Sequence, residues 1–481
     1  MPPTRLSALD ASFLAAETPT AHMHVGWAAV FAAPDDGRRP TFQQLRDHID
    51  ARLERAPRYR QKLAQVPFGV HDPVWVDDSE FDIANHVQEA GGGDIDTIVA
   101  NVMSTPLERS RAMWECWIAP ELDDGRIGIV GKVHHCMVDG LAAVELAALL
   151  LDGEPDAPQP GNQNKWEADT TPNGLSRLVR GLLDRSTEVL DVARRPLAVL
   201  TSPRRIADAA AEGGRIASAV RNSFANPARP TGALNPPLSP LRHLARFERP
   251  LDDLMRIKQH FGTTVNDVVL AACAGAVRDF LVHHEEPAFA VKAMVPVTQR
   301  SAEQAGGLGN RISFLFVDLP SDEADPVDRL RAVHATTKER KESGEAHGGD
   351  LVLNALGYAP HMVQRQLTRL VASPRTFNLV VSNIPGPPAA MWMRGCALEE
   401  AYPIVPLADR HAVAIGMTTL PGRAFFGVYA DRKMLPDAQA LAEAIDDALD
   451  ELLAECEPPP TGNGHRRRAG AARTRESVGA R

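Results

Sequence analysis

Apolar and polar positions along the chain follow two periods, and each period predicts a different kind of element. Residues 25–31, 114–118 and 128–133 are short apolar runs that predict strands, whereas residues 41–55 carry apolar side chains at helical spacing. Strands that alternate with helices are typical of layered α/β domains. The pattern therefore predicts one such domain over residues 1–152.

The same alternation resumes at Arg242 and continues to Cys456. Between the two halves, residues 153–240 combine stretches rich in Pro, Gly and Asn with helical segments, so we expect a linker with amphipathic helices. A chain of 481 residues is too long for a single core. We therefore expect a second α/β domain over residues 241–456 and a disordered basic tail over residues 457–481.

One face of the linker helices is apolar and arginines lie beside it, which leaves two interpretations open. In the first, the helices pack across the two domains. In the second, they form a basic amphipathic surface that meets lipid. The apolar positions are Leu175, Leu178, Val179, Leu182 and Leu183, and the arginines are Arg177, Arg180 and Arg185.

Composition narrows the class of protein. A net charge of −10 argues against nucleic acid as a partner. The five cysteines are scattered and form no C-x-x-C pair, so neither a disulfide framework nor a zinc site is indicated, and a reducing compartment is favoured. No apolar run approaches the ~20 residues of a membrane span, and the N-terminus lacks an apolar signal core. We expect a cytoplasmic protein, with peripheral contact to the inner face of the membrane or to a lipid droplet left open.

The most specific stretch reads V-H-H-C-M-V-D-G over residues 133–140, at a predicted strand-to-helix junction. Histidine is the usual general base near neutral pH. Adjacent side chains in an extended segment point to opposite sides, so only one of His134 and His135 should face a substrate. The other is expected to be a buried, hydrogen-bonded support.

The remaining positions of the motif have competing interpretations. Asp139 could be a proton-relay carboxylate, or an acid that caps a helix and pairs with an arginine. Gly140 permits a tight turn. Cys136 could act as an acyl-carrying nucleophile, but the pleat would turn it away from His135.

The pattern H-H-x-x-x-D-G resembles the signature of the acyl-CoA-dependent acyltransferase superfamily, which includes chloramphenicol acetyltransferases and peptide-synthetase condensation domains. The resemblance implies that His135 is the base and that Asp139 is structural. Residues 55–63 are similar to the Arg-containing motif of condensation domains. Arg60 falls where the partner of the Asp would be, which predicts an Asp139–Arg60 pair.

Further motifs resemble one branch, the bacterial wax ester synthase/diacylglycerol acyltransferases. They are L-S-A-L-D-A-S-F-L-A-A-E-T-P-T-A-H-M-H-V-G (6–26), P-L-E-R-S-R-A-M-W-E (106–115), V-N-D-V-V-L-A (265–271), P-V-T-Q-R with L-G-N-R-I-S (296–313) and V-S-N-I-P-G-P (381–387). Ala112 departs from the family pattern, which has a second Pro there. The resemblance covers residues 5 to about 453.

The resemblance implies two chloramphenicol-acetyltransferase-like sandwich domains with mixed sheets and a tunnel at their interface. It also implies transfer of a fatty acyl group from acyl-CoA to diacylglycerol or a long-chain alcohol, with acyl-CoA as substrate and no cofactor or metal. Residues with a predicted tunnel role are Asn266, Ser382, Asn383, Pro385 and Gly386, although the turn at 382–387 could simply reverse the chain. The alternatives are a condensation-like enzyme with a carrier-bound donor and a non-catalytic lipid-binding relative.

Overall fold

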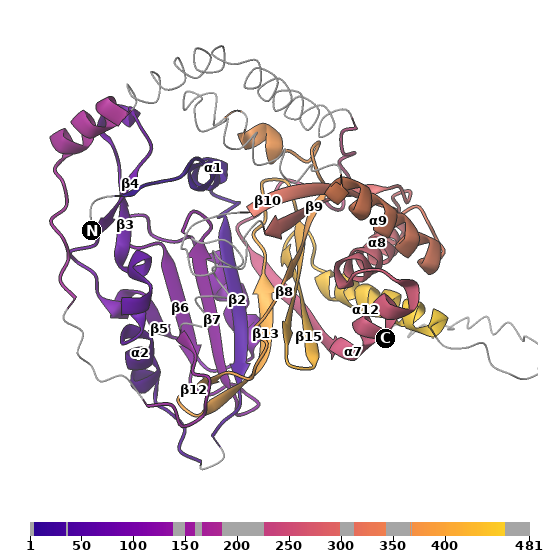
Figure 1. Ribbon diagram of the computed structural model, residues 1–481, viewed down its shortest axis with the longest axis horizontal. Coiled ribbons are helices and arrows are strands. Elements are labelled where there is room, and N and C mark those ends of the chain that lie inside the picture. The colour runs from indigo at the N-terminus through magenta and orange to yellow at the C-terminus, as the bar shows by residue number, and fades with distance from the viewer. Residues whose placement is uncertain are drawn as a thin grey trace, which may run out of the picture.

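Two six-stranded mixed sheets carry the architecture of the part of the chain that the computed structural model describes (Figure 1). This part comprises residues 4–34, 37–137, 150–158, 166–184, 226–298, 312–342, 366 and 368–456. The predicted helix at 141–151 lies outside it except for its last two residues, as do the predicted helices at 185–225 and the tail at 457–481.

The first sheet is built mainly from the N-terminal half of the chain. Its strand order is β12 (Trp392–Met393), β13 (Cys396–Ile404), β2 (His24–Phe31), β7 (Ile127–His134), β6 (Trp114–Ala119) and β5 (Val87–Glu89). The parallel pairing in this sheet joins β5 to β6, and the other pairings are antiparallel. Every residue of β7 is buried, because α2 (Phe42–Asp50) and α3 (Ile95–Ser104) contribute to separate cores on the two faces.

The second sheet has the order β10 (Ile312–Leu319), β9 (Val291–Thr298), β11 (Leu379–Ile384), β14 (Val413–Leu420), β15 (Arg423–Asp431) and β8 (Arg242–Pro250). Helices cover its outer face in Figure 1: α7 (Leu251–Phe261), α8 (Val265–His283), α9 (Pro326–Glu342) and α12 (Ala438–Glu455). Apolar residues of α8 are buried almost continuously from Val268 to Val277, which fits its central place among these helices.

Smaller elements frame the first sheet. They are β1 (Thr4–Arg5), α1 (Ala8–Ala16), β3 (Gln61–Ala64), β4 (Val74–Asp77) and the short 3-10 helices Leu53–Arg55, Pro57–Arg60, Pro67–Gly69 and Ile83–Asn85. The strands β1, β4 and β3 form a separate three-stranded sheet. Residues 174–184 are helical, within the segment predicted as the linker.

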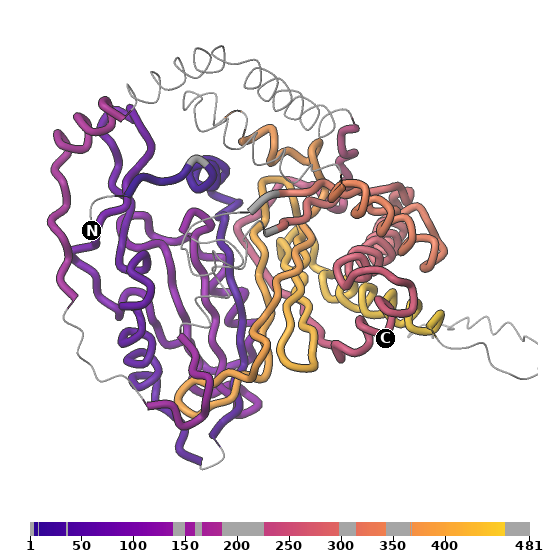
Figure 2. Tube along the Cα trace, viewed as in Figure 1, coloured from indigo at the N-terminus to yellow at the C-terminus, as the bar shows by residue number. Residues whose placement is uncertain are grey.

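The C-terminal half of the chain contributes a segment to the first sheet. Strands β12 and β13 come from the C-terminal half, yet β13 pairs antiparallel with β2 in the first sheet, with Ala401 opposite Ala29. The orange segment that reaches the purple strands in Figure 2 is this crossover. A Cβ atom on Gly427 of β15 would lie 2.4 Å from the Pro403 carbonyl oxygen, so glycine lets β13 pass close to the second sheet. The predicted division into consecutive domains did not include this crossover.

Polar side chains also join the sheets. Arg246 on β8 donates from Nε to Asp96 on α3 at 2.7 Å and from Nη1 to Glu400 on β13 at 3.1 Å. The Arg246 guanidinium also lies over the ring of Tyr402, 5.0 Å from its centroid. One cation thereby contacts both halves of the chain.

In the described parts, no helix has the length and apolar character that crossing a bilayer requires.

Candidate active site

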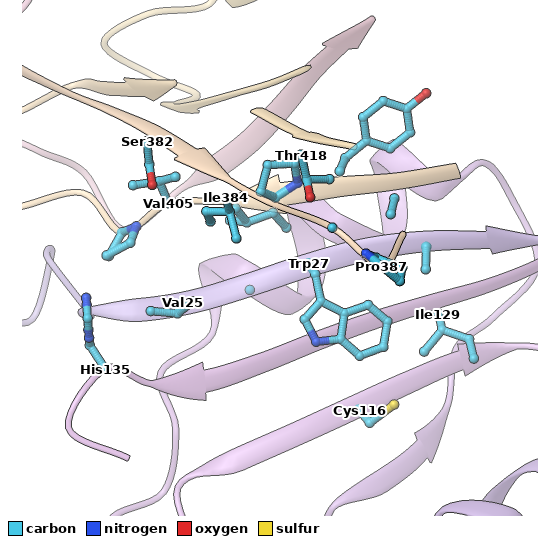
Figure 3. A pocket seen from close by; sticks show the side chains of 18 of the residues that line it. Val25, Trp27, Cys116, Ile129, His135, Ser382, Ile384, Pro387, Val405 and Thr418 are labelled. Carbon is cyan, nitrogen blue, oxygen red and sulfur yellow. The ribbon is translucent and has the colours of Figure 1, made fainter. Parts of the chain in front are cut away.

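A largely apolar cavity lies where the first sheet meets the second (Figure 3). Its empty volume is about 1540 Å³, part of which is open to solvent. From β2, alternate residues face it: Val25, Trp27, Ala29 and Phe31. From the second half of the chain the described lining includes Met294, Pro296, Phe314, Val380, Ser382, Ile384, Val405 and Thr418.

His135 lines this cavity and is 8% exposed. It follows the last residue of β7, and its backbone N–H donates to the Met23 carbonyl oxygen at 3.0 Å, which extends the pairing of β7 with β2. Its imidazole stacks on the ring of Phe13 in α1, with centroids 3.7 Å apart and planes 8° from parallel. The strand end fixes the backbone and the Phe13 ring fixes the plane of the imidazole.

His134 points away from the cavity and is buried behind the sheet. Its Nδ1 accepts the backbone N–H of Cys136 at 3.1 Å, and its Nε2 lies 3.4 Å from a carboxylate oxygen of Glu17. Burial alone would raise the pKa of Glu17, but interactions with His134 and Arg109 lower it below its ordinary value. The pleat therefore separates the two histidines as the alternation predicts.

Asp139 and Gly140 lie outside the described residues, so the Asp139–Arg60 pair stays a prediction. Arg60 itself is buried. Its Nη2 lies 3.4 Å from Asp50 Oδ1, and its guanidinium lies over the rings of Phe81 and Trp166. These contacts fix the Arg60 side chain at the end of the short helix Pro57–Arg60, against Asp50 and the two aromatic rings.

Ser382 and Gly386 line the cavity, which is the position that a role in a substrate tunnel requires. Among the described residues around the cavity, Asn383, Pro385 and Asn266 are not part of the lining. Asn383 alternates with Ser382 and Ile384 on β11, so the pleat directs it to the other face. Asn266 is half-buried at the start of α8, beside a capping box that Thr264 and Asp267 form.

Gly386 is held closely against the neighbouring strand. A Cβ atom there would lie 1.8 Å from the carbonyl oxygen of Thr419, so no larger residue fits without a shift of the backbone.

Burial raises the pKa of the Cys136 thiol well above its ordinary value. A thiol that stays protonated is a poor nucleophile, which argues against an acyl-carrying role for Cys136.

Two lining groups were not anticipated. The indole of Trp27 and the ring of Phe13 both face the cavity, although no sequence motif indicates a role for either of them. The signal for Trp27 was the alternation within residues 25–31, which places it on the same face of β2 as Val25. Phe13 carries no comparable signal, because its contact with His135 joins segments that are distant in the sequence.

The arrangement offers one imidazole at the wall of an apolar cavity. An imidazole so placed can take a proton from a bound hydroxyl, and the apolar walls limit the water that competes with that hydroxyl. Within the described ranges, no group of three or more His, Cys, Asp or Glu side chains is placed to hold a metal ion.

Comparison with known proteins gives consistent results along the chain. Residues 6–269 match the profile of the wax ester synthase/diacylglycerol acyltransferase catalytic domain, and residues 308–453 match the C-terminal domain of the same family. A protein of Mycobacterium tuberculosis (strain H37Rv), named as a probable diacylglycerol O-acyltransferase, is 32% identical over 461 residues, which cover 93% of this chain and 96% of that protein.

Solved structures show the same fold. The wax ester synthase/diacylglycerol acyltransferase from Marinobacter aquaeolei VT8 superimposes with a TM-score of 0.66 at 24% identity, covering 94% of this chain and 99% of that one. The starter condensation domain of rhizomide synthetase, solved in complex with C8-CoA, superimposes with a TM-score of 0.58 at 11% identity, covering 94% and 95%. The predicted α/β class, with mixed sheets in a condensation-like arrangement, is confirmed.

Proposed function

The chain belongs to the wax ester synthase/diacylglycerol acyltransferase family, and from that premise we propose that it transfers a fatty acyl group from acyl-CoA to the hydroxyl of diacylglycerol or a long-chain alcohol. The observation that carries the proposal is the position of His135 on the wall of a large, mostly apolar cavity. Such a cavity suits hydrocarbon chains, and a base on its wall suits a hydroxyl brought beside a thioester.

The reaction needs one proton acceptor and no covalent enzyme intermediate. His135 takes the hydroxyl proton as the alcohol oxygen attacks the thioester carbonyl carbon. The C–S bond then breaks, and the imidazolium returns the proton to the departing thiolate. The products are the ester and free CoA, so atoms and charges balance. The stacked ring of Phe13 supports this role because it limits rotation of the imidazole.

The acyl-CoA donor draws support from a distant fold relative that was solved with C8-CoA. The acceptor draws support from the names of relatives, which specify diacylglycerol or wax ester chemistry. In this cavity the hydroxyls of Ser382 and Thr418 are among the few polar groups, and they are suited to contact the polar part of either substrate. Figure 3 shows Ser382 toward the His135 end of the view.

Contact with a lipid surface is part of the proposal. The helix at 174–184 leaves Leu175 and Leu182 exposed at 71% and 52%, and Phe68 nearby is 91% exposed. A Cβ atom on Gly174 would lie 3.7 Å from Cγ of Pro67, and one on Gly181 would lie 3.1 Å from Cγ1 of Val66, so this helix packs beside the segment that carries Phe68. Exposed apolar groups of this size mark interaction sites, and diacylglycerol resides in membranes.

A competition assay tests the proposal. Purified protein is given a long-chain acyl-CoA together with diacylglycerol, long-chain alcohols and short alcohols, and the same acyl group is offered on acyl carrier protein in parallel. Ester formed from acyl-CoA and a long-chain acceptor is the expected result. Turnover with the carrier-bound donor alone would favour a condensation-like enzyme, and free thiol without ester would indicate a thioesterase. Either result would overturn the proposal.

A further inference from the structure

A second, smaller cavity adjoins the one that contains His135. Its empty volume is about 380 Å³, and its lining includes the aromatic side chains of Tyr59 and Trp114. Four residues border both cavities: Trp27, Ile49, Cys116 and Leu150. The two spaces are therefore neighbours and share part of their walls.

The indole of Trp27 is seated against the backbone of the adjacent strand. Trp27 on β2 lies opposite Gly131 on β7, and Gly131 lies opposite Cys116 on β6. A Cβ atom on Gly131 would lie 2.5 Å from Cε2 of the indole and 2.7 Å from both Cζ2 and Nε1. The ring thus occupies the space that any other residue at position 131 would need for its side chain. Figure 3 shows the indole turned from β2 toward Cys116 and Ile129.

The place of Trp27 along β2 matters for a bound chain. His24 pairs with His134, so the strand runs away from the His135 end through Val25 to Trp27 and then to Phe31. At about 3.3 Å per residue, Trp27 lies roughly 10 Å along β2 from His24. A hydrocarbon chain that extends from the reacting carbon along β2 meets the indole part of the way along the cavity.

We propose that Trp27, seated on Gly131, limits the length of the hydrocarbon chain that this enzyme accepts, by closing the second cavity to a chain that enters from His135. The inference rests on the proposed function, since it concerns a chain bound beside the catalytic base. The ligand class is an extended alkyl chain, which either the acyl donor or the acceptor could supply.

Two substitutions act in opposite directions. Trp27→Ala removes the partition and joins the cavities, so the preferred chain becomes longer. Gly131→Ala pushes the indole into the main cavity, so the preferred chain becomes shorter. Each methylene that gains or loses a buried position should change kcat/KM by about fourfold. Series of acyl-CoA lengths with one acceptor, and of acceptor lengths with one donor, show which substrate supplies the chain.

Trp117→Ala is the matched control. Trp117 lies on β6 in the same sheet, but it packs against the core between the sheets and borders neither cavity. This variant should lose thermal stability without a change in chain preference. A shift in opposite directions for the Trp27 and Gly131 variants, in one of the two series, supports the inference. An unchanged preference in Trp27→Ala, or an equal shift in Trp117→Ala, overturns it.

A binding measurement separates this inference from the proposed function and serves if Gly131→Ala fails to fold. A fatty acid brominated near the end of its chain should quench tryptophan emission in the wild type. In Trp27→Phe, which keeps an aromatic partition, that quenching should fall. Quenching equal to that of the wild type would overturn the place assigned to Trp27, even in a protein that shows no acyl transfer. If quenching falls in Trp27→Phe but the wild-type protein shows no acyl transfer, the position of Trp27 beside the bound chain is supported and the proposed reaction is refuted.

Discussion

At the scale of single residues, the strand pleat divides the two adjacent histidines between opposite sides of the segment. His135 faces the cavity against Phe13, whereas His134 is held from behind by the backbone of Cys136 and by Glu17. The alternation of an extended segment was sufficient to predict that division. The surroundings of Arg60 were not predictable in this way, because its ring contacts come from segments brought together only by the fold.

His135→Ala should abolish ester formation while the protein stays folded. General acid–base catalysis contributes about 10²- to 10⁴-fold to the rate of a reaction, so kcat should fall by at least about 10²-fold. The assay follows ester product and CoA release, and thermal melting reports folding. His283→Ala is the control, since His283 begins the other His-His pair of the chain and is exposed at the end of α8. An active His135→Ala enzyme would assign the base elsewhere.

At the scale of elements, strands and helices with regular periodicity were predicted well. The strands predicted at 25–31 and 128–133 agree with β2 and β7 within one residue at each end. The main omission is β13, which reads C-A-L-E-E-A-Y-P-I. Consecutive glutamates and a proline obscure its alternation, and its pairing with β2 depends on contacts distant in the sequence. Local sequence patterns therefore do not predict the crossover of β13, which helps to form the cavity.

The capping box of α8 allows a graded test of stability. Thr264→Ala removes one cap and should cost about 1 kcal/mol of unfolding free energy. Asp267→Ala should cost more, about 2 kcal/mol or above, because the buried carboxylate also accepts from His334 at 2.8 Å and from Thr337 at 2.7 Å on α9. Urea unfolding measures both values. Thr41→Ala in the exposed capping box of α2 should match Thr264→Ala. Equal costs at Thr264 and Asp267 would contradict the link to α9.

The helix at 174–184 is expected to contribute to lipid binding. Replacement of Leu175 and Leu182 by Ser removes two exposed apolar side chains, so binding to vesicles that contain diacylglycerol should weaken severalfold. Flotation of protein with vesicles measures the effect. Val282→Ser is the control, because Val282 is 58% exposed on a different helix. A loss of binding no larger than in the control would leave helix packing as the better interpretation of this face.

At the scale of the whole molecule, buried histidines should make stability depend on pH. Burial, the largest cause in each case, lowers the pKa of His22, His24, His86 and His411 below the ordinary value of 6.5. Below that value the unfolded chain binds protons that the folded protein does not, so the free energy of unfolding falls as the pH falls. Each such proton contributes about 1.4 kcal/mol per pH unit.

Urea unfolding between about pH 8 and about pH 5 checks this expectation. The midpoint should be nearly constant above the ordinary histidine pKa and should fall progressively below it. His24→Gln should reduce the slope, since the ring nitrogens of His24 are buried without a hydrogen-bond partner in the described structure and its pKa is lowered strongly. A midpoint that does not change with pH in this window would show that the buried imidazoles accept protons without cost.

The late position of β13 in the sequence has a consequence for how the protein is synthesised. While the ribosome is still translating, β2 can pair with β7, but its other edge has no partner until Cys396–Ile404 has emerged. The exposed edge would present the sequence H-V-G-W-A-A-V-F, an apolar strand of the kind that joins other unpaired strands. The nascent first half is thus a natural client for chaperones, and its sheet is completed only when almost the whole polypeptide has been made.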